Sequence, residues 1–214
     1  MVKAVIFDMD GLMINSERAT FEEYQTILSK QNLTMSEKFY KQLLGKTLKT
    51  VYQIFYKEYG EDFPLDDIIL EVHDALALRF EQKGVPLKKG LVKLLSYLKN
   101  NSYKTIVATS SERKRVDTIL GQAHLTEYFD DSICGDEVTK GKPNPEVFLK
   151  ACEKLNVLPS EAVVLEDSEA GIEAAYNAGI RVICIPDMKY PEAKYEKMTY
   201  QMLDSLDQVI DLLK

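Results

Sequence analysis

Histidine and cysteine are scarce in this sequence of 214 residues, which contains two histidines and three cysteines. His73 and His124 lie far apart, and neither neighbours a cysteine or forms an H-x-x-x-H pair. Because zinc sites are built from such clusters, we do not expect one. Cys134, Cys152 and Cys184 are widely spaced in apolar surroundings, so we expect reduced thiols in the core.

Long apolar runs and an excess of basic residues are also missing. The first apolar run, Ala4 to Phe7, is too short for a signal peptide or a membrane-spanning helix, so we expect a cytoplasmic protein. The chain has 27 Lys and Arg against 34 Asp and Glu, a net charge of −7. A field of that sign disfavours nucleic acid and anionic membranes as partners, and it admits an anionic small substrate only beside a local cation and oriented amides.

The remaining composition is ordinary, with 45% hydrophobic and 29% charged residues and no low-complexity tract. This is typical of a soluble globular protein long enough to fold without disulfides or a structural metal. The length allows one large domain or a core with a modest insert. Since no long apolar surface stripe is evident, we expect a monomer.

Apolar and β-branched runs alternate with helical patterns along most of the chain. The runs are 4–7, 105–108, 131–134, 162–165 and 182–185, and the helical patterns are 90–100, 112–121, 145–155 and 168–178. Continuous apolar runs between helices indicate buried strands of a parallel sheet. The sequence therefore predicts an α/β fold, a Rossmann-like doubly wound parallel sheet.

One segment, residues 16–83, breaks this alternation. It has no convincing strand and carries apolar residues at helical spacing, as in Ile69, Val72, Leu76 and Phe80. We therefore predict a core of residues 1–15 and 84–214 with an inserted α-helical cap domain, residues 16–83.

Acidic residues follow two of the predicted strands. Asp8 and Asp10 end the first strand, and Glu166 and Asp167 end the fourth. The first pair alone equally suits a solvated turn. If the two strands are neighbours, however, three or four carboxylates meet at the sheet edge where ligands bind in open α/β sheets. Their repulsion is relieved by a hard cation, and oxygen ligands suit Mg²⁺.

Two further segments could bind phosphate. Thr109 and Ser110 precede a helix, where backbone N–H groups and hydroxyls form a phosphate cradle or simply a helix cap. Lys142 lies between Gly141 and Pro143 in a rigid loop, which would position it more tightly than a solvated lysine.

Taken in order, these segments resemble the haloacid dehalogenase-like hydrolase superfamily over nearly the whole chain. The motifs are Asp8-Met9-Asp10-Gly11, Ala108-Thr109-Ser110, Gly141-Lys142-Pro143-Asn144-Pro145 and Glu166-Asp167-Ser168, with Gly171 and Ala178-Gly179. Within the superfamily, the chain looks most like the phosphatases and β-phosphoglucomutases whose helical cap follows the first strand.

The resemblance implies a role for each of the first three polar segments. Asp8 would attack phosphorus and form an aspartyl-phosphate while binding Mg²⁺. Asp10 would serve as acid and then as base, and its carbonyl would bind the metal. Thr109 and the Ser110 amide would hold phosphoryl oxygens.

It also implies roles for the later segments. Lys142 would pair with Asp8 and the phosphate. Asp167 would bind Mg²⁺, and Glu166 would do so directly or through water. The substrate implied is a small phosphate ester, most simply a sugar phosphate.

Departures from the family pattern concern the hinge and cap more than the chemistry. Leu12 and Asn15 replace threonine and aspartate of many relatives. Thr20 stands where mutases carry a histidine, and Lys46 lies in a loop where they carry an arginine. Hydrolysis is therefore favoured over a β-phosphoglucomutase-like transfer, which remains the alternative because Lys46 could replace part of the arginine's function.

Other readings fit less well. A dehalogenase needs neither a metal nor Asp10, and a receiver domain would be shorter and lack the helical insert. A non-catalytic binding or regulatory module would be expected to have lost a catalytic position, yet all are intact. The cap should select the substrate, and candidates for contacting it are Arg18, Thr20, Tyr24, Lys46 and Thr47.

Overall fold

The computed structural model describes residues 1–46 and 48–214, so Thr47 of the cap candidates lies outside the described residues. The chain forms two compact units, an α/β unit of residues 1–15 and 85–214 and a helical unit of residues 16–84. The second boundary lies one residue beyond the predicted one. Gly84 ends the last helix of the helical unit, since its backbone N–H donates to the Phe80 carbonyl and its φ is +81°.

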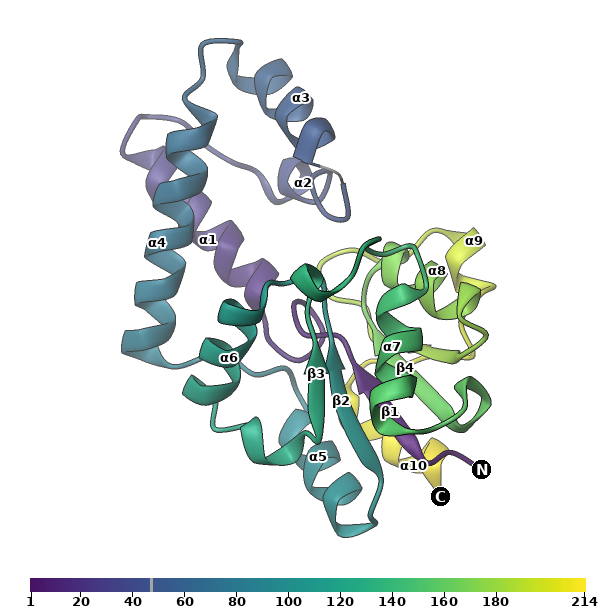
Figure 1. Ribbon diagram of the computed structural model, residues 1–214. Coiled ribbons are helices and arrows are strands. Elements are labelled where there is room, and N and C mark those ends of the chain that lie inside the picture. The colour runs from purple at the N-terminus through teal and green to yellow at the C-terminus, as the bar shows by residue number, and fades with distance from the viewer. Residues whose placement is uncertain (47) are drawn as a thin grey trace. The chain divides into compact units, whose positions relative to one another are not determined.

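A six-stranded parallel sheet forms the centre of the α/β unit and confirms the predicted fold class (Figure 1). Its spatial order is β3 (Asp131–Ile133), β2 (Lys104–Ala108), β1 (Ala4–Phe7), β4 (Ala162–Glu166), β5 (Arg181–Cys184) and β6 (Gln201–Met202). Five strands match the predicted runs. The two-residue edge strand β6 has no apolar run and was not predicted.

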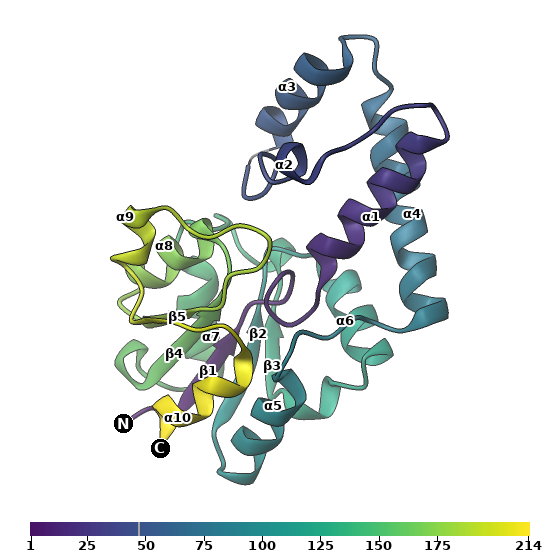
Figure 2. The ribbon, with the colours of Figure 1, turned by 180° about the vertical axis from the view of Figure 1, so that it is seen from behind.

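Helices cover both faces of this sheet (Figures 1 and 2). One face packs against α7 (Glu146–Leu155) and α8 (Glu169–Asn177), and α5 (Leu91–Asn100) and α10 (Val209–Leu213) lie on the other. Helix α6 (Arg113–Gln122) follows β2, and α9 (Ala193–Glu196) precedes β6. Short 3-10 helices occupy Thr126–Tyr128, Gly135–Glu137, Pro159–Glu161 and Leu206–Gln208.

Alternation along the strands divides the core between the two faces. Ala4 and Ile6 of β1 belong to the cluster formed with α7 and α8, and the intervening Val5 and Phe7 are also fully buried. The predicted burial of Cys134, Cys152 and Cys184 is confirmed. In the described residues, none of the helices combines the length and apolar character needed to cross a membrane.

The helical unit consists, in its described residues, of helices and connecting segments. These helices are α1 (Ser16–Ser29), α2 (Glu37–Tyr40), α3 (Leu48–Tyr59) and α4 (Leu65–Lys83). In α4, Val72, Leu76 and Phe80 are buried as predicted, whereas Ile69 is half-buried and the neighbouring Ile68 takes the buried position one turn before Val72. Phe55 of α3 is fully buried among aromatic rings, lying 5.5 Å from Phe39 and 5.7 Å from Tyr24 between ring centroids.

The order of the strands in the sheet determines where a ligand-binding site is expected. From β1 the sheet extends in one direction to β2 and β3 and in the other to β4, β5 and β6. Ligands of open α/β sheets bind beyond the carboxyl ends of the strands where the order reverses. In this chain that point lies between β1 and β4, which pair directly.

The aromatic cluster of the helical unit gives a stability prediction. Phe55→Ala should lower the free energy of unfolding by about 3–5 kcal/mol, because it leaves a cavity between packed rings. Gln53→Ala, an exposed change in the same helix, should shift it by less than about 0.5 kcal/mol. Urea denaturation followed by circular dichroism measures both, and equal losses would contradict a core role for Phe55.

Candidate active site

A tight loop continues β1 and carries the first two acids. The Asp8 N–H still bonds to the Leu165 carbonyl, so Asp8 is held to β4 at the sheet edge. The chain then turns at Gly11, whose φ is +84°. A Cβ at Gly11 would overlap the Asp167 carboxylate. Glycine here therefore allows the loop after β1 to approach the end of β4 closely.

Lys142 joins the ends of three strands. Its ammonium lies 2.6 Å from Asp8 Oδ1 and 2.6 Å from Glu166 Oε1, and it donates to the Ala108 carbonyl at 3.1 Å. Only 6% of the side chain is exposed. The ammonium also lies 4.8 Å from the centroid of the Phe148 ring. The expected pairing of Lys142 with Asp8 is thus present, and Glu166 is a second partner.

Glu166 is completely buried, and both its carboxylate oxygens are engaged. Oε1 accepts from Lys142, and Oε2 accepts from the backbone N–H groups of Asp167 and Ser168 and from the Ser168 hydroxyl. A Cβ at Gly171 would overlap this carboxylate, so the first turn of α8 is open there because residue 171 is glycine. These contacts make Glu166 the anchor that holds Lys142 at the sheet edge.

Burial and neighbouring charges shift the ionisation of this pair. Burial, together with the negative charges of Glu166 and Asp10, raises the pKa of Asp8 to about 8, although Lys142 acts in the opposite direction. Burial disfavours the Lys142 ammonium, but Asp8 and Glu166 outweigh it and raise the pKa of Lys142. In the absence of a further cation, the site therefore favours a charged Lys142 beside an Asp8 carboxyl group that takes up a proton more readily than usual.

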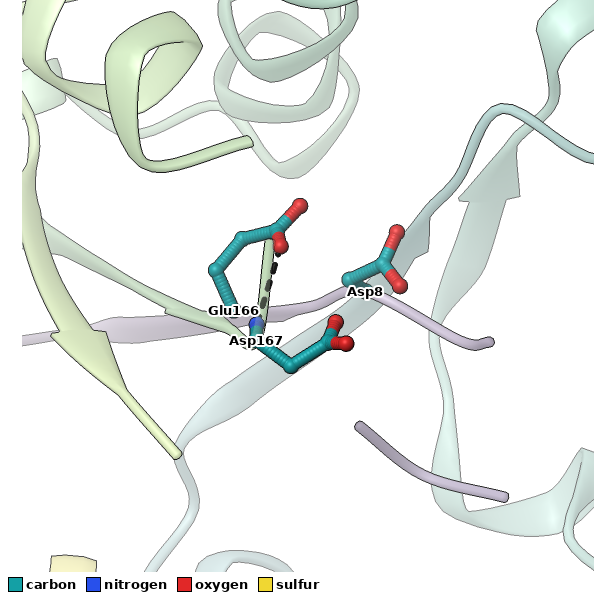
Figure 3. A group of neighbouring side chains, drawn as sticks. All are labelled: Asp8, Glu166 and Asp167. Atoms are coloured by element: carbon teal, nitrogen blue, oxygen red, sulfur yellow. Dashed lines mark hydrogen bonds between the residues drawn. The ribbon is translucent and has the colours of Figure 1, made fainter. Parts of the chain in front are cut away.

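Three of the predicted metal ligands meet at this edge (Figure 3). One carboxylate oxygen each from Asp8, Glu166 and Asp167 lies within 4.8 Å of the others. In Figure 3 the Asp8 and Asp167 carboxylates lie next to each other, and Glu166 lies to one side. Such a group of hard oxygen donors fits a divalent cation. With both oxygens of Glu166 engaged, Asp8 and Asp167 are the better placed direct ligands.

Asp10 is held by two residues that the sequence did not assign to the site. Ser111 Oγ donates to Asp10 Oδ2 at 2.7 Å, and the Arg115 guanidinium lies 2.7 Å from Oδ1. Ser111 adjoins the predicted phosphate-binding segment. Arg115 belongs to three consecutive cations, residues 113–115, in the first turn of α6, where no acidic residue occurs. Cations are unfavourable at a helix N-terminus, so this charge pattern was the sequence feature that could have indicated a functional role for Arg115.

Thr109 and Ser110 lie at the end of β2, in different environments. Thr109 is buried, and its hydroxyl accepts from the Ser111 N–H at 3.1 Å, which shapes the turn toward α6. Ser110 is exposed. Both follow Ala108, whose carbonyl contacts Lys142, so the segment belongs to the same sheet edge as the acids.

The predicted cap residues lie in the helical unit. Arg18 forms a 3.0 Å ion pair with Glu37, and Tyr24 is buried against Tyr40 and Phe55. Thr20 is half-buried and Lys46 is exposed. Tyr24 is thus a core residue of this unit. Substrate contact by Arg18, Thr20 or Lys46 stays a prediction.

The position of Glu166 gives a stability prediction. Glu166→Ala should cost about 3–5 kcal/mol of unfolding free energy, because it removes one partner of a buried ion pair. Glu166→Gln should cost less, since the amide oxygen still accepts from the Asp167 and Ser168 N–H groups, and Lys142, which loses an acceptor, keeps Asp8 and the Ala108 carbonyl. Urea denaturation in EDTA measures both. Equal, small losses would show that the Lys142 anchor is unimportant for folding.

Comparison with known proteins shows the family to which the chain belongs. Residues 5–185 match the family described as haloacid dehalogenase-like hydrolase. A phosphorylated carbohydrates phosphatase from Thermotoga maritima is 32% identical over 182 residues, covering 85% of this chain and 84% of that protein. Validoxylamine A 7'-phosphate phosphatase from Streptomyces hygroscopicus is 31% identical over 180 residues, with 84% of each chain covered.

Solved structures agree. A Thermotoga maritima protein provisionally assigned as a β-phosphoglucomutase has a TM-score of 0.82 at 28% identity, covering 99% of this chain and 98% of its own. CbbY from Rhodobacter sphaeroides, solved with phosphate, has a TM-score of 0.78 at 25% identity, with 98% and 96% covered. The predicted family is thereby confirmed, and the chain belongs to the haloacid dehalogenase-like hydrolases.

Proposed function

We propose that this protein is a Mg²⁺-dependent phosphatase that hydrolyses a small phosphate monoester through an aspartyl-phosphate on Asp8. The observation that carries the proposal is the buried Lys142 ammonium between Asp8 and Glu166, with Asp167 beside them at the switch point of the sheet. A solvated turn would not require a buried lysine shared by two buried acids. Phosphoryl transfer depends mainly on positioning and charge neutralisation, which such a cluster supplies.

In the first step, an Asp8 carboxylate oxygen attacks phosphorus and the bond from phosphorus to the ester oxygen breaks. Asp10 supplies the proton that the departing oxygen requires. Lys142, within 2.6 Å of Asp8, offsets the charge that develops on the phosphoryl group. Thr109 and the Ser110 amide, at the end of β2, would hold the phosphoryl oxygens.

In the second step, water replaces the alcohol. The Asp10 carboxylate accepts a proton from water while the water oxygen attacks phosphorus. The bond from phosphorus to the Asp8 oxygen breaks, which releases inorganic phosphate and restores the Asp8 carboxylate. Asp10 ends the cycle protonated, ready for the next ester.

The acid cluster fits a Mg²⁺ ion. Asp8 and Asp167 would hold it with the main-chain carbonyl of Asp10, and Glu166, whose oxygens are occupied, would act through a water. When bound, the ion supplies positive charge to the acids and to the phosphoryl oxygens. It would also lower the pKa of Asp8 and keep the nucleophile ionised.

The substrate class rests on weaker support. The Thermotoga maritima relative is named for phosphorylated carbohydrates, and the Streptomyces relative for validoxylamine A 7'-phosphate. We infer a phosphorylated sugar or similar polyol, chosen in part by Arg18, Thr20 and Lys46 of the helical unit. A β-phosphoglucomutase-like transfer is the second candidate, since a protein provisionally assigned to that activity shares the fold at a TM-score of 0.82.

Phosphate release from a panel of phosphomonoesters tests the main proposal. We expect release with Mg²⁺, its loss in EDTA, and a fall of at least about 10⁴-fold in Asp8→Asn, because the amide is a poor nucleophile. Glu173→Gln, a half-buried change elsewhere on α8, should leave the rate unchanged. Release that survives Asp8→Asn would rule out Asp8 as the nucleophile.

Absence of release from every ester would redirect the proposal. Turnover of β-glucose 1-phosphate to glucose 6-phosphate in the same protein would then favour the mutase. No turnover in either assay would favour a non-catalytic binding module on the same fold.

The raised pKa of Asp8 gives a second prediction, on metal binding. Because the pKa lies at about 8 without metal and Mg²⁺ needs the carboxylate, affinity should rise with pH and level off above that value. Below it, each pH unit should weaken binding by up to about tenfold. Calorimetry in two buffers of different ionisation enthalpy should detect a released proton, which Asp8→Asn should lack. Affinity independent of pH would contradict the assignment.

A further inference from the structure

Asp10 is held at both ends of its carboxylate by donors outside the acid cluster. Ser111 Oγ lies 2.7 Å from Oδ2, and the Arg115 guanidinium lies 2.7 Å from Oδ1. The Asp10 side chain is 26% exposed, so burial alone does not fix its rotamer. Two charge-assisted hydrogen bonds to opposite oxygens fix the plane of the carboxylate.

The two donors are themselves fixed by the sheet edge. The Ser111 N–H donates to Thr109 Oγ1, and the Ser111 carbonyl accepts from the Gly135 N–H at 2.8 Å. At the start of α6, Asp136 accepts from the Arg113 N–H at 3.0 Å. The position of the Asp10 carboxylate is therefore fixed relative to β2 and to the segment after β3.

Charge at the start of α6 points to the same contact. Arg113, Lys114 and Arg115 are placed where the helix dipole disfavours cations. Arg113 is accounted for by its bonds to Ser132 and Glu137, and Lys114 is exposed. Arg115 is directed at Asp10 instead. Since the Arg115 side chain is 38% exposed, this ion pair contributes little to the stability of the fold.

We propose that Arg115 is a positioning residue for catalysis, which together with Ser111 orients the Asp10 carboxyl group, so that it gives its proton to the departing ester oxygen and then, as the carboxylate, takes one from the attacking water. This inference rests on the proposed function of Asp10. It assigns to α6 a part in both chemical steps, although Arg115 touches neither phosphorus nor the acid cluster of Asp8, Glu166 and Asp167.

A positioning role predicts an effect that depends on the leaving group. An alkoxide requires a proton as it departs, whereas p-nitrophenolate leaves without one. Loss of Arg115 should therefore slow the release of an alkyl or sugar alcohol and spare the first step with p-nitrophenyl phosphate. Hydrolysis of the aspartyl-phosphate still requires Asp10 as base, so the phosphoenzyme should accumulate with p-nitrophenyl phosphate.

The test compares Arg115→Gln with Lys114→Gln, which removes the same charge from the adjacent exposed position of α6. With glucose 6-phosphate or the best alkyl ester of the panel, Arg115→Gln should lower kcat at least about tenfold, because a positioned acid or base contributes about 10²–10⁴-fold. KM should change by less than about threefold. The burst rate of p-nitrophenolate release should stay within about twofold of the wild-type rate.

The remaining variants separate positioning from other roles. Arg115→Lys, which keeps a donor of reduced reach, should recover part of the lost kcat, and Lys114→Gln should match the wild type. Asp10→Asn should show the same dependence on leaving group, only larger. If Asp10→Asn lacks that dependence, the proposed role of Asp10 fails and the inference falls with it.

Three results would overturn the role of Arg115 while leaving that of Asp10 intact. An unchanged kcat would show that the contact between Arg115 and Asp10 does not contribute to catalysis. A raised KM with an unchanged kcat would make Arg115 a substrate ligand. An equal loss in the p-nitrophenolate burst and in alkyl ester turnover would show a general disturbance of the site.

Discussion

The site depends on a buried ammonium held between two buried carboxylates. Lys142 could not stay charged and buried at the sheet edge without acidic partners. An unpaired ammonium in such surroundings would lose its proton, or the side chain would turn out into water. Asp8 and Glu166 each approach it to 2.6 Å, and the Ala108 carbonyl accepts from it as well. One cation thus ties the ends of β1, β2 and β4 together. Any change in the length or register of these strands would separate its partners.

The same arrangement leaves an excess of negative charge that shapes the neighbouring residues. Asp8 and Glu166 share Lys142, Asp167 lies beside these two acids, and Asp10 has its own partner in Arg115. The acids are therefore sorted into two groups. One group lies around Lys142 and fits a divalent cation, and the other is oriented from α6. Because Lys142 positions the proposed nucleophile and Arg115 positions the proposed acid–base group, the orientation of each can change without disturbing the other.

Most of the fold could be predicted, and so could the identity of the acids, because both depend on local pattern. Continuous apolar runs gave five of the strands, and acids at strand ends indicated the site. Strand β6 has two residues and no pattern, so its pairing is set by the chain around it. Glu166 was expected at the metal rather than at Lys142, and Arg115 was missed. Both contacts join segments 24 and 105 residues apart, which sequence spacing does not encode.

The net charge of −7 imposes a further condition on any phosphate ester that reaches this edge. Long-range attraction is absent, so binding must come from charges close to the phosphoryl group, where screening by water is weak. Lys142 is the nearest cation to Asp8, but it is already shared by two carboxylates. A divalent ion would therefore have to supply most of the attraction. On this argument, metal and substrate bind interdependently, and the acids that repel the substrate in the free protein become, with the ion, the surface that holds it.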